Sequence, residues 1–177
     1  MINPNDVKAK AQKLEDENYE FRAFLKNHAD EDELDAHFLS LHKELFENYD
    51  CCKCANCCKE YNISFDGTDV ARISAFLGIG EKDFIAKHLN DADSDDEKPY
   101  VTKVKPCPFL CDDGRCEIQD CKPISCREFP YTDQPERLWS LLGVLSNAEV
   151  CPVVFEILER LKVIYRFRKT STLKRVK

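Results

Sequence analysis

The fold of this chain is decided by a dense run of cysteines, Cys51-Cys52-Lys53-Cys54-Ala55-Asn56-Cys57-Cys58. Cys51, Cys54 and Cys57 are spaced C-x2-C-x2-C, and at this spacing successive side chains can turn toward one point. Cysteines that only fill space in a core rarely cluster so densely. On ordinary backbone the side chain of Cys58 must diverge from that of Cys57, so it can serve a second site. This first cysteine run, residues 51–58, therefore predicts thiolate ligands of a metal.

A second cysteine group, residues 107–126, lies further along the chain. Its first part, Cys107-Pro108-Phe109-Leu110-Cys111, leads into the turn Asp112-Asp113-Gly114, which returns the chain to Cys116. This pattern predicts a knuckle-like hairpin, followed by Cys121, Cys126 and, at the start of a last helix, Cys151. A metal shared by these regions would tie the middle of the chain together. The protein without metal should then be poorly folded, because ligation supplies folding energy.

Composition places these thiols in a reducing environment. The eleven cysteines are an odd number, and no segment of the 177 residues is apolar for long enough to span a bilayer. We therefore expect a cytoplasmic protein with no membrane partner, in which cysteines bind metal or act in redox chemistry. The net charge is −7 with neutral histidines, so we expect no binding to nucleic acid.

Helical periodicity is strongest in the flanking regions. Apolar side chains recur at helical spacing from Val7 to Tyr49, which predicts a helical pair or one long broken helix. This segment can pack on the core or on a protein partner. Shorter helices are predicted around 70–77 and 84–89, and a clear amphipathic helix begins at Pro152. Residues 99–104 and 137–145 are strand-like.

The expected fold is therefore mainly α with a small β-hairpin or sheet (α+β). It is a single cysteine- and metal-organised domain with an N-terminal helical extension. The predicted boundaries are residues 1–50 for the N-terminal helical segment, 51–165 for the cysteine-cluster domain and 166–177 for a basic tail. The acidic stretch 91–97 is expected to be a solvated loop.

The cysteine pattern resembles a known family, the CxxCxxCC family of zinc- or iron-chelating domains, which is related to flagellin lysine N-methylase. The matching features are the first cysteine run, Cys107-Pro108-Phe109-Leu110, Gly114-Arg115-Cys116-Glu117-Ile118, Pro123-Ile124-Ser125-Cys126-Arg127-Glu128-Phe129-Pro130 and Cys151-Pro152. The chain departs from the family's usual residues at Ala55, Gln119 and Lys122, where glycine, tyrosine and arginine are usual.

The resemblance implies eight metal ligands, which are Cys51, Cys54, Cys57, Cys58, Cys107, Cys116, Cys126 and Cys151. It leaves Cys52, Cys111 and Cys121 as additional cysteines, which we assign as non-ligands. Eight thiolates equal two four-sulfur sites, although one site is also compatible with the pattern. The spacing suits a 4Fe-4S iron–sulfur cluster, and separated knuckles suit zinc.

Three functional hypotheses follow. The first is a metal-binding protein with no assigned activity. The second is an enzyme resembling a cluster-dependent protein lysine N-methyltransferase, for which the sequence offers no nucleotide-binding glycine motif. The third is a zinc-stapled interaction module whose protein partner contacts the N-terminal helices. Arg127 is expected to neutralise the thiolate site, and none of the four histidines, His28, His37, His42 and His88, has metal-binding spacing.

Overall fold

A computed structural model of the chain describes residues 1–92 and 99–169. The chain divides into two compact units, and each is described by itself. The helical unit comprises Met1–Tyr49 and Pro130–Lys177, and the cysteine unit comprises Asp50–Phe129. Most of the predicted acidic loop and most of the basic tail lie outside the described residues. The domain boundaries expected from the sequence stay a prediction.

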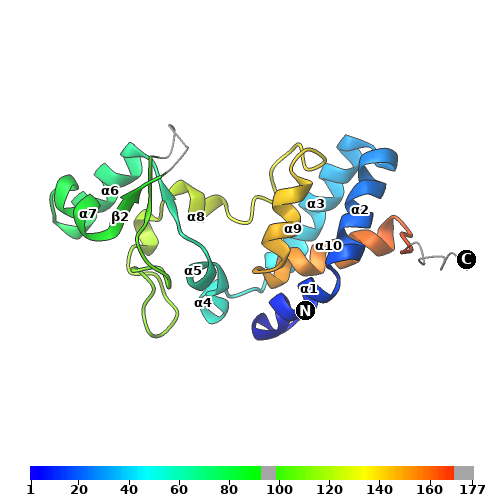
Figure 1. Ribbon diagram of the computed structural model, residues 1–177, viewed down its shortest axis with the longest axis horizontal. Coiled ribbons are helices and arrows are strands. Elements are labelled where there is room, and N and C mark those ends of the chain that lie inside the picture. The colour runs from blue at the N-terminus through cyan, green and yellow to red at the C-terminus, as the bar shows by residue number, and fades with distance from the viewer. Residues whose placement is uncertain (93–98, 170–177) are drawn as a thin grey trace, which may run out of the picture. The chain divides into compact units, whose positions relative to one another are not determined.

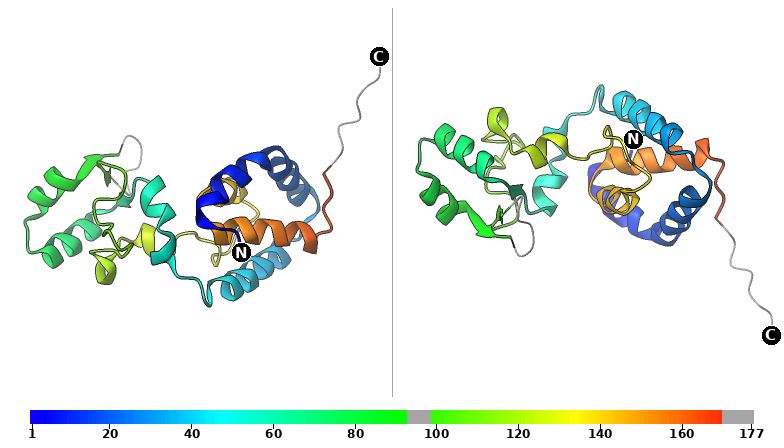
Figure 2. Two further views of the ribbon diagram at one scale, coloured as in Figure 1. Left: turned by 90° about the horizontal axis from the view of Figure 1, so that it is seen from below. Right: turned by 90° about the horizontal axis from the view of Figure 1, so that it is seen from above.

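The helical unit is built around the amphipathic helix α10 (Pro152–Ile164), which begins with proline at a first-turn position. The other elements are a short 3-10 helix η1 (Pro4–Asp6), α1 (Val7–Lys13), α2 (Glu15–His28), α3 (Glu31–Phe46) and α9 (Leu141–Ala148). Helix α10 packs against α1, α3 and α9, and Figure 2 shows it running between the N-terminal helices.

Apolar side chains from both ends of the chain form the core of this unit. Helices α2 and α3 contribute Phe21, Leu25, Leu34 and Phe38, which are at most 1 % exposed, and α10 contributes Val154, Ile157 and Leu161. Core packing of the N-terminal helices is therefore confirmed. Helices α2 and α3 are separated by Ala29 and Asp30, and the Asp30 side chain caps α3 by accepting a hydrogen bond from the Glu33 N–H at 3.0 Å. None of the described helices combines the length and apolar character needed to cross a membrane.

The cysteine unit consists of short helices and a small antiparallel sheet. Its elements are α4 (Cys51–Cys54), α5 (Asn56–Glu60), β1 (Ser64–Phe65), α6 (Gly67–Leu77), α7 (Glu81–His88), β2 (Leu89–Asp91), β3 (Tyr100–Thr102), the 3-10 helix η2 (Gln119–Cys121) and α8 (Ile124–Glu128). The strand order is β1-β3-β2, with Ser64 opposite Val101 and Leu89 opposite Thr102. Helix α6 contacts α7 and β1, and α7 contacts β2, as Figure 1 shows for α6, α7 and β2.

Aromatic packing holds the cysteine unit together. The rings of Phe65, Phe84 and Phe109 lie 6.0 to 6.5 Å apart, centroid to centroid, and all three are at most 2 % exposed. Phe109 belongs to the Cys107-Pro108-Phe109-Leu110 motif, and Cys107 and Cys116 pack against this core with partial burial. The aromatic residue of the motif thus anchors the second cysteine group on β1 and α7.

The predicted fold class, mainly helical with a small sheet, is confirmed. The strand predicted at 99–104 is β3, but the strand predicted at 137–145 is wrong. That region forms turns followed by α9, because Leu141, Val144 and Ala148 recur at helical spacing and are all buried. The buried Arg137 fixes the turns by donating hydrogen bonds to the carbonyl oxygens of Tyr131 at 2.6 Å and Pro135 at 2.8 Å.

Candidate metal centre

The first cysteine run folds as two short helices separated by one unusual residue. The Asp50 side chain accepts a hydrogen bond from the Cys52 N–H at 3.0 Å and so caps α4. Ala55 then adopts φ 51° and ψ 17°, the left-handed conformation that favours glycine. This residue is the position at which the family usually has glycine, and the break lets α5 begin in a new direction. Cys51 and Cys54 thus lie on α4, whereas Cys57 and Cys58 lie on α5.

A backbone hydrogen bond joins the two cysteine groups directly. The Cys107 N–H donates to the Cys58 carbonyl oxygen at 2.7 Å. The residues between them fold back through β1, α6, α7 and the sheet, as the sequence requires of a shared site. The main chain therefore holds the first cysteine run beside the start of the second cysteine group, regardless of how the thiol side chains are oriented.

The predicted hairpin is present in the second cysteine group. Leu110 and Cys116 form an isolated antiparallel bridge, and the Cys111 N–H donates to the Arg115 carbonyl oxygen at 2.9 Å. Gly114, at φ 84°, makes the turn at the tip. A Cβ atom at Gly114 would collide with the Cys52 carbonyl oxygen. The tip of the hairpin therefore lies directly against α4, and only glycine permits that approach.

Helix α8 brings Cys126 to the same region. The Ser125 hydroxyl, next to Cys126, donates to the Ser64 carbonyl oxygen at 2.8 Å, which fixes α8 on strand β1. Within the helix, the Cys126 N–H donates to the Pro123 carbonyl oxygen at 3.0 Å. Cys126 is partly buried in this position.

Four of the predicted ligands form one electrostatic neighbourhood, which we call the four-thiol group: Cys58, Cys107, Cys116 and Cys126. Burial, followed by the charges of the other three thiols, raises the pKa of Cys126 to about 12. Burial also raises the pKa of Cys107 to about 11, and Cys58 and Cys116 add to that shift. The pKa of Cys116 is raised by burial first and, among other thiols, by Cys58. All six pairs within the group therefore interact.

Cys58 differs from the other three because its pKa is lowered to about 7. The largest cause is a hydrogen bond from the adjacent Cys57 thiol, which stabilises the Cys58 thiolate, and burial opposes the shift. The positive charges of Lys122 and Lys59 assist. The adjacent Cys57 and Cys58 thus act on each other in this structure, and Cys58 is the most readily ionised member of the four-thiol group.

Lys122 is a site residue that the sequence interpretation missed. Its positive charge contributes to the lowered pKa of Cys58, and it opposes the rise in the pKa of Cys116, Cys126 and Cys51. The role expected of Arg127 stays a prediction, and Lys122 is thus a second candidate for offsetting the charge of the thiolates. Its place between Cys121 and Cys126 was the available signal, because a cation inside a cysteine group remains close to the thiols.

The remaining predicted ligands are placed differently. Cys51 interacts with Cys54 and Cys52, which gathers thiols on α4. Cys151 is buried in the helical unit, where it precedes α10. Among the cysteines assigned as non-ligands, Cys111 is exposed and Cys121 is buried. The eight-ligand assignment as a whole stays a prediction, as does the absence of histidine ligands.

The donor set of the four-thiol group fits a soft metal such as zinc or iron, which thiolate sulfur prefers. The side chains are gathered but do not converge: in the chain segments 1–92 and 99–169, no three His, Cys, Asp or Glu side chains are arranged to hold an ion. Ligation would therefore require thiols to turn inward from positions that the main chain already holds near one another.

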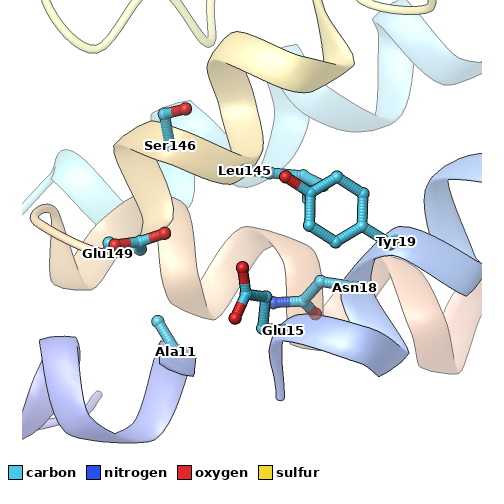
Figure 3. Close-up of a pocket in the computed structure, with 7 residues that line it drawn as sticks. All are labelled: Ala11, Glu15, Asn18, Tyr19, Leu145, Ser146 and Glu149. Carbon is cyan, nitrogen blue, oxygen red and sulfur yellow. The ribbon is translucent and has the colours of Figure 1, made fainter. Parts of the chain in front are cut away.

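A small hollow lies elsewhere, in the helical unit. Figure 3 shows the carboxylates of Glu15 and Glu149 and the ring of Tyr19 around it, and its volume is about 30 Å³. That volume corresponds to about one water molecule, so this hollow does not accommodate a nucleotide-sized cofactor. It contains no cysteine or histidine among its lining residues.

Comparison with known proteins identifies the region that carries these cysteines. The family model CxxCxxCC, described as "Putative zinc- or iron-chelating domain", matches residues 50–152, more than half of the chain. No curated protein and no solved structure matches the chain.

Proposed function

Because the chain belongs to the CxxCxxCC family of zinc- or iron-chelating domains, we propose that it binds a thiophilic metal through the four-thiol group. Cys58, Cys107, Cys116 and Cys126 supply the sulfur ligands of this centre. The observation that carries the proposal is that all six pairs among these thiols interact, although they come from α5, the hairpin and α8.

Contacts that do not involve the thiol side chains support the same grouping. The hydrogen bond from Cys107 to Cys58, the Leu110–Cys116 bridge and the attachment of α8 to β1 each bring one ligand into place. These contacts do not depend on the rotamers of the thiols. Four sulfur ligands satisfy tetrahedral zinc and also a 4Fe-4S cluster. When bound, the metal would cross-link three segments of the cysteine unit and contribute to its folding free energy.

The metal is zinc or iron, and the C-x2-C-x2-C spacing keeps an iron–sulfur cluster within the proposal. A second centre would use thiols outside the four-thiol group, and the gathering of Cys51 and Cys54 on α4 supports that extension. We also propose a cytoplasmic location, because a reducing compartment keeps such thiols available for ligation.

Elemental analysis of the full chain, purified without oxygen, tests this proposal. We expect zinc or iron bound to the protein, with acid-labile sulfide if a cluster is present. The variants Cys116→Ser and Cys126→Ser should each reduce metal content, because a hydroxyl is a poor substitute for a thiolate with these metals. The matched control is Cys111→Ser, which changes an exposed thiol of the same hairpin and should retain the metal. Protein that binds neither metal, or variants that bind it as well as the unchanged chain, would refute the proposal.

A further inference from the structure

A charged clamp on α6 holds the segment between η2 and α8. The Arg72 guanidinium donates hydrogen bonds to the carbonyl oxygen of Cys121 at 2.6 Å and to that of Lys122 at 3.2 Å. Its other terminal nitrogen donates to the carboxylate of Asp69, one turn earlier on the helix. These contacts link residues separated by about fifty positions in the sequence.

Asp69 is well suited to orient Arg72. Its side chain is 3 % exposed, and its backbone N–H donates to the Asp66 side chain at 2.7 Å. One Asp69 carboxylate oxygen contacts Arg72, and the other has no hydrogen-bond partner within the described chain. A buried carboxylate is costly without a cation, so Asp69 restrains the guanidinium strongly.

Arg72 binds the backbone of Lys122, the residue whose positive charge acts on the thiols. Arg72 holds the carbonyl group of Lys122, and the Lys122 side chain extends from that fixed point. Its ammonium influences Cys58, Cys116 and Cys126, three members of the four-thiol group, and also Cys51.

We propose that Asp69 and Arg72 are positioning residues that deliver the Lys122 ammonium to the metal centre, where it offsets the negative charge left by ligation. This inference rests on the proposed function. Four thiolates leave an excess of two negative charges on a divalent zinc ion, in a partly buried site of a chain whose net charge is already −7. A fixed cation near the ligands lowers that electrostatic cost, as outer groups around metal sites commonly do.

Zinc affinity of the full chain tests the charge, measured by competition with a chromophoric chelator. Lys122→Met should weaken zinc binding by about tenfold at low ionic strength, and by less in high salt, because exposed charges are screened. Lys122→Arg should restore most of the affinity. The matched control is Lys53→Met, which also removes one positive charge. Lys53 lies between Cys52 and Cys54, and its side chain is 86 % exposed. This variant should change the affinity by no more than about twofold.

A double-variant comparison tests the clamp itself. Arg72→Gln should weaken zinc binding on its own but add little in the Lys122→Met background, because both changes remove the same charge from the site. Circular dichroism establishes that each variant is folded. If Arg72→Gln does not fold, Asp69→Asn, which loosens the guanidinium and keeps the side-chain volume, should show the same dependence on Lys122.

The outcomes separate this inference from the proposed function. A full chain that binds zinc, together with a Lys122→Met variant of unchanged affinity, would overturn the role of Lys122 and leave metal binding established. An Arg72→Gln effect that persists undiminished in the Lys122→Met background would show that Arg72 does not act through Lys122. A full chain that binds neither zinc nor iron would overturn both.

Discussion

Gly114→Ala should separate the hairpin from the first cysteine run. Gly114 has φ 84°, and an alanine Cβ there would collide with the Cys52 carbonyl oxygen. A positive φ costs a non-glycine residue about 1–2 kcal/mol. The collision is with backbone, which yields less easily than a side chain, and such overpacking costs about 1–3 kcal/mol. We therefore expect the free energy of unfolding of the cysteine unit to fall by about 2–5 kcal/mol.

The assay is urea denaturation of the metal-free and zinc-loaded chain. Far-UV circular dichroism follows both units, and the fluorescence of Trp139, the single tryptophan, follows the helical unit. Gly114→Ala should shift the first signal and leave the second unchanged, and it should also weaken zinc binding. The matched control is Gly143→Ala on α9, where a Cβ meets nothing within 4 Å. This change should stabilise the helical unit by about 0.5–1 kcal/mol, because alanine is the better helix former.

The decisive expectation is that the same substitution, glycine to alanine, lowers the free energy of unfolding at Gly114 and raises it at Gly143. If Gly114→Ala unfolds at the same urea concentration as the unchanged chain and binds zinc equally well, the approach of the hairpin to α4 is wrong. The proposed grouping of cysteines from the two groups would then lose one of its main-chain supports.

Three further predictions follow from the cysteine unit. Zinc affinity should rise by about a thousandfold per pH unit near pH 8, because Cys107, Cys116 and Cys126, whose pKa values are all raised by burial, must each lose a proton on binding; below about pH 7 Cys58 adds a fourth. Calorimetry in buffers of different ionisation enthalpy counts these protons, and a pH-independent affinity would contradict ligation by these thiols. Ala55→Gly should raise the free energy of unfolding by about 0.5–1 kcal/mol, by relieving the left-handed conformation, and a lower urea midpoint would argue against that conformation. Phe109→Ala should cost about 3–5 kcal/mol in a thermal or urea melt, because it empties the centre of the aromatic core; an unchanged melt would place Phe109 outside it.

Much of the fold could be predicted because its signals are local. The helical spacing before residue 50, the proline at the start of α10 and the Asp112-Asp113-Gly114 turn each act over a few residues, and the structure contains the corresponding elements. The segment 137–145 was misjudged because its apolar residues were read as a strand, whereas Leu141 and Val144 belong to the buried face of α9 and residues 137–140 form turns. The turns before α9 are fixed in part by Asp35, whose carboxylate accepts a hydrogen bond from the Arg137 N–H at 2.8 Å, and a contact between residues about a hundred positions apart has no local signature.

From the sequence, the kind of ligand at the candidate site could be predicted, but the arrangement of the ligands could not. Cysteine spacing predicted thiol ligands and a diverging Cys58, but it did not indicate that Cys58 would lie near the second cysteine group while Cys51 and Cys54 gather on α4. That division depends on the left-handed Ala55 and on the hydrogen bond between Cys107 and Cys58. The role of Arg72 was not predictable either, because its partners lie about fifty residues away.

The discontinuous helical unit sets an order of events during synthesis of the protein. Helices α1, α2 and α3 leave the ribosome before the cysteine unit, but their core also requires α10, which is translated after that unit. The cysteine unit is continuous in sequence, so all of its residues have been translated before α10 is made. Its thiols can therefore meet cellular metal while the nascent helices before it still lack their packing partner. Metal supply and the speed of translation should consequently influence the yield of folded protein together.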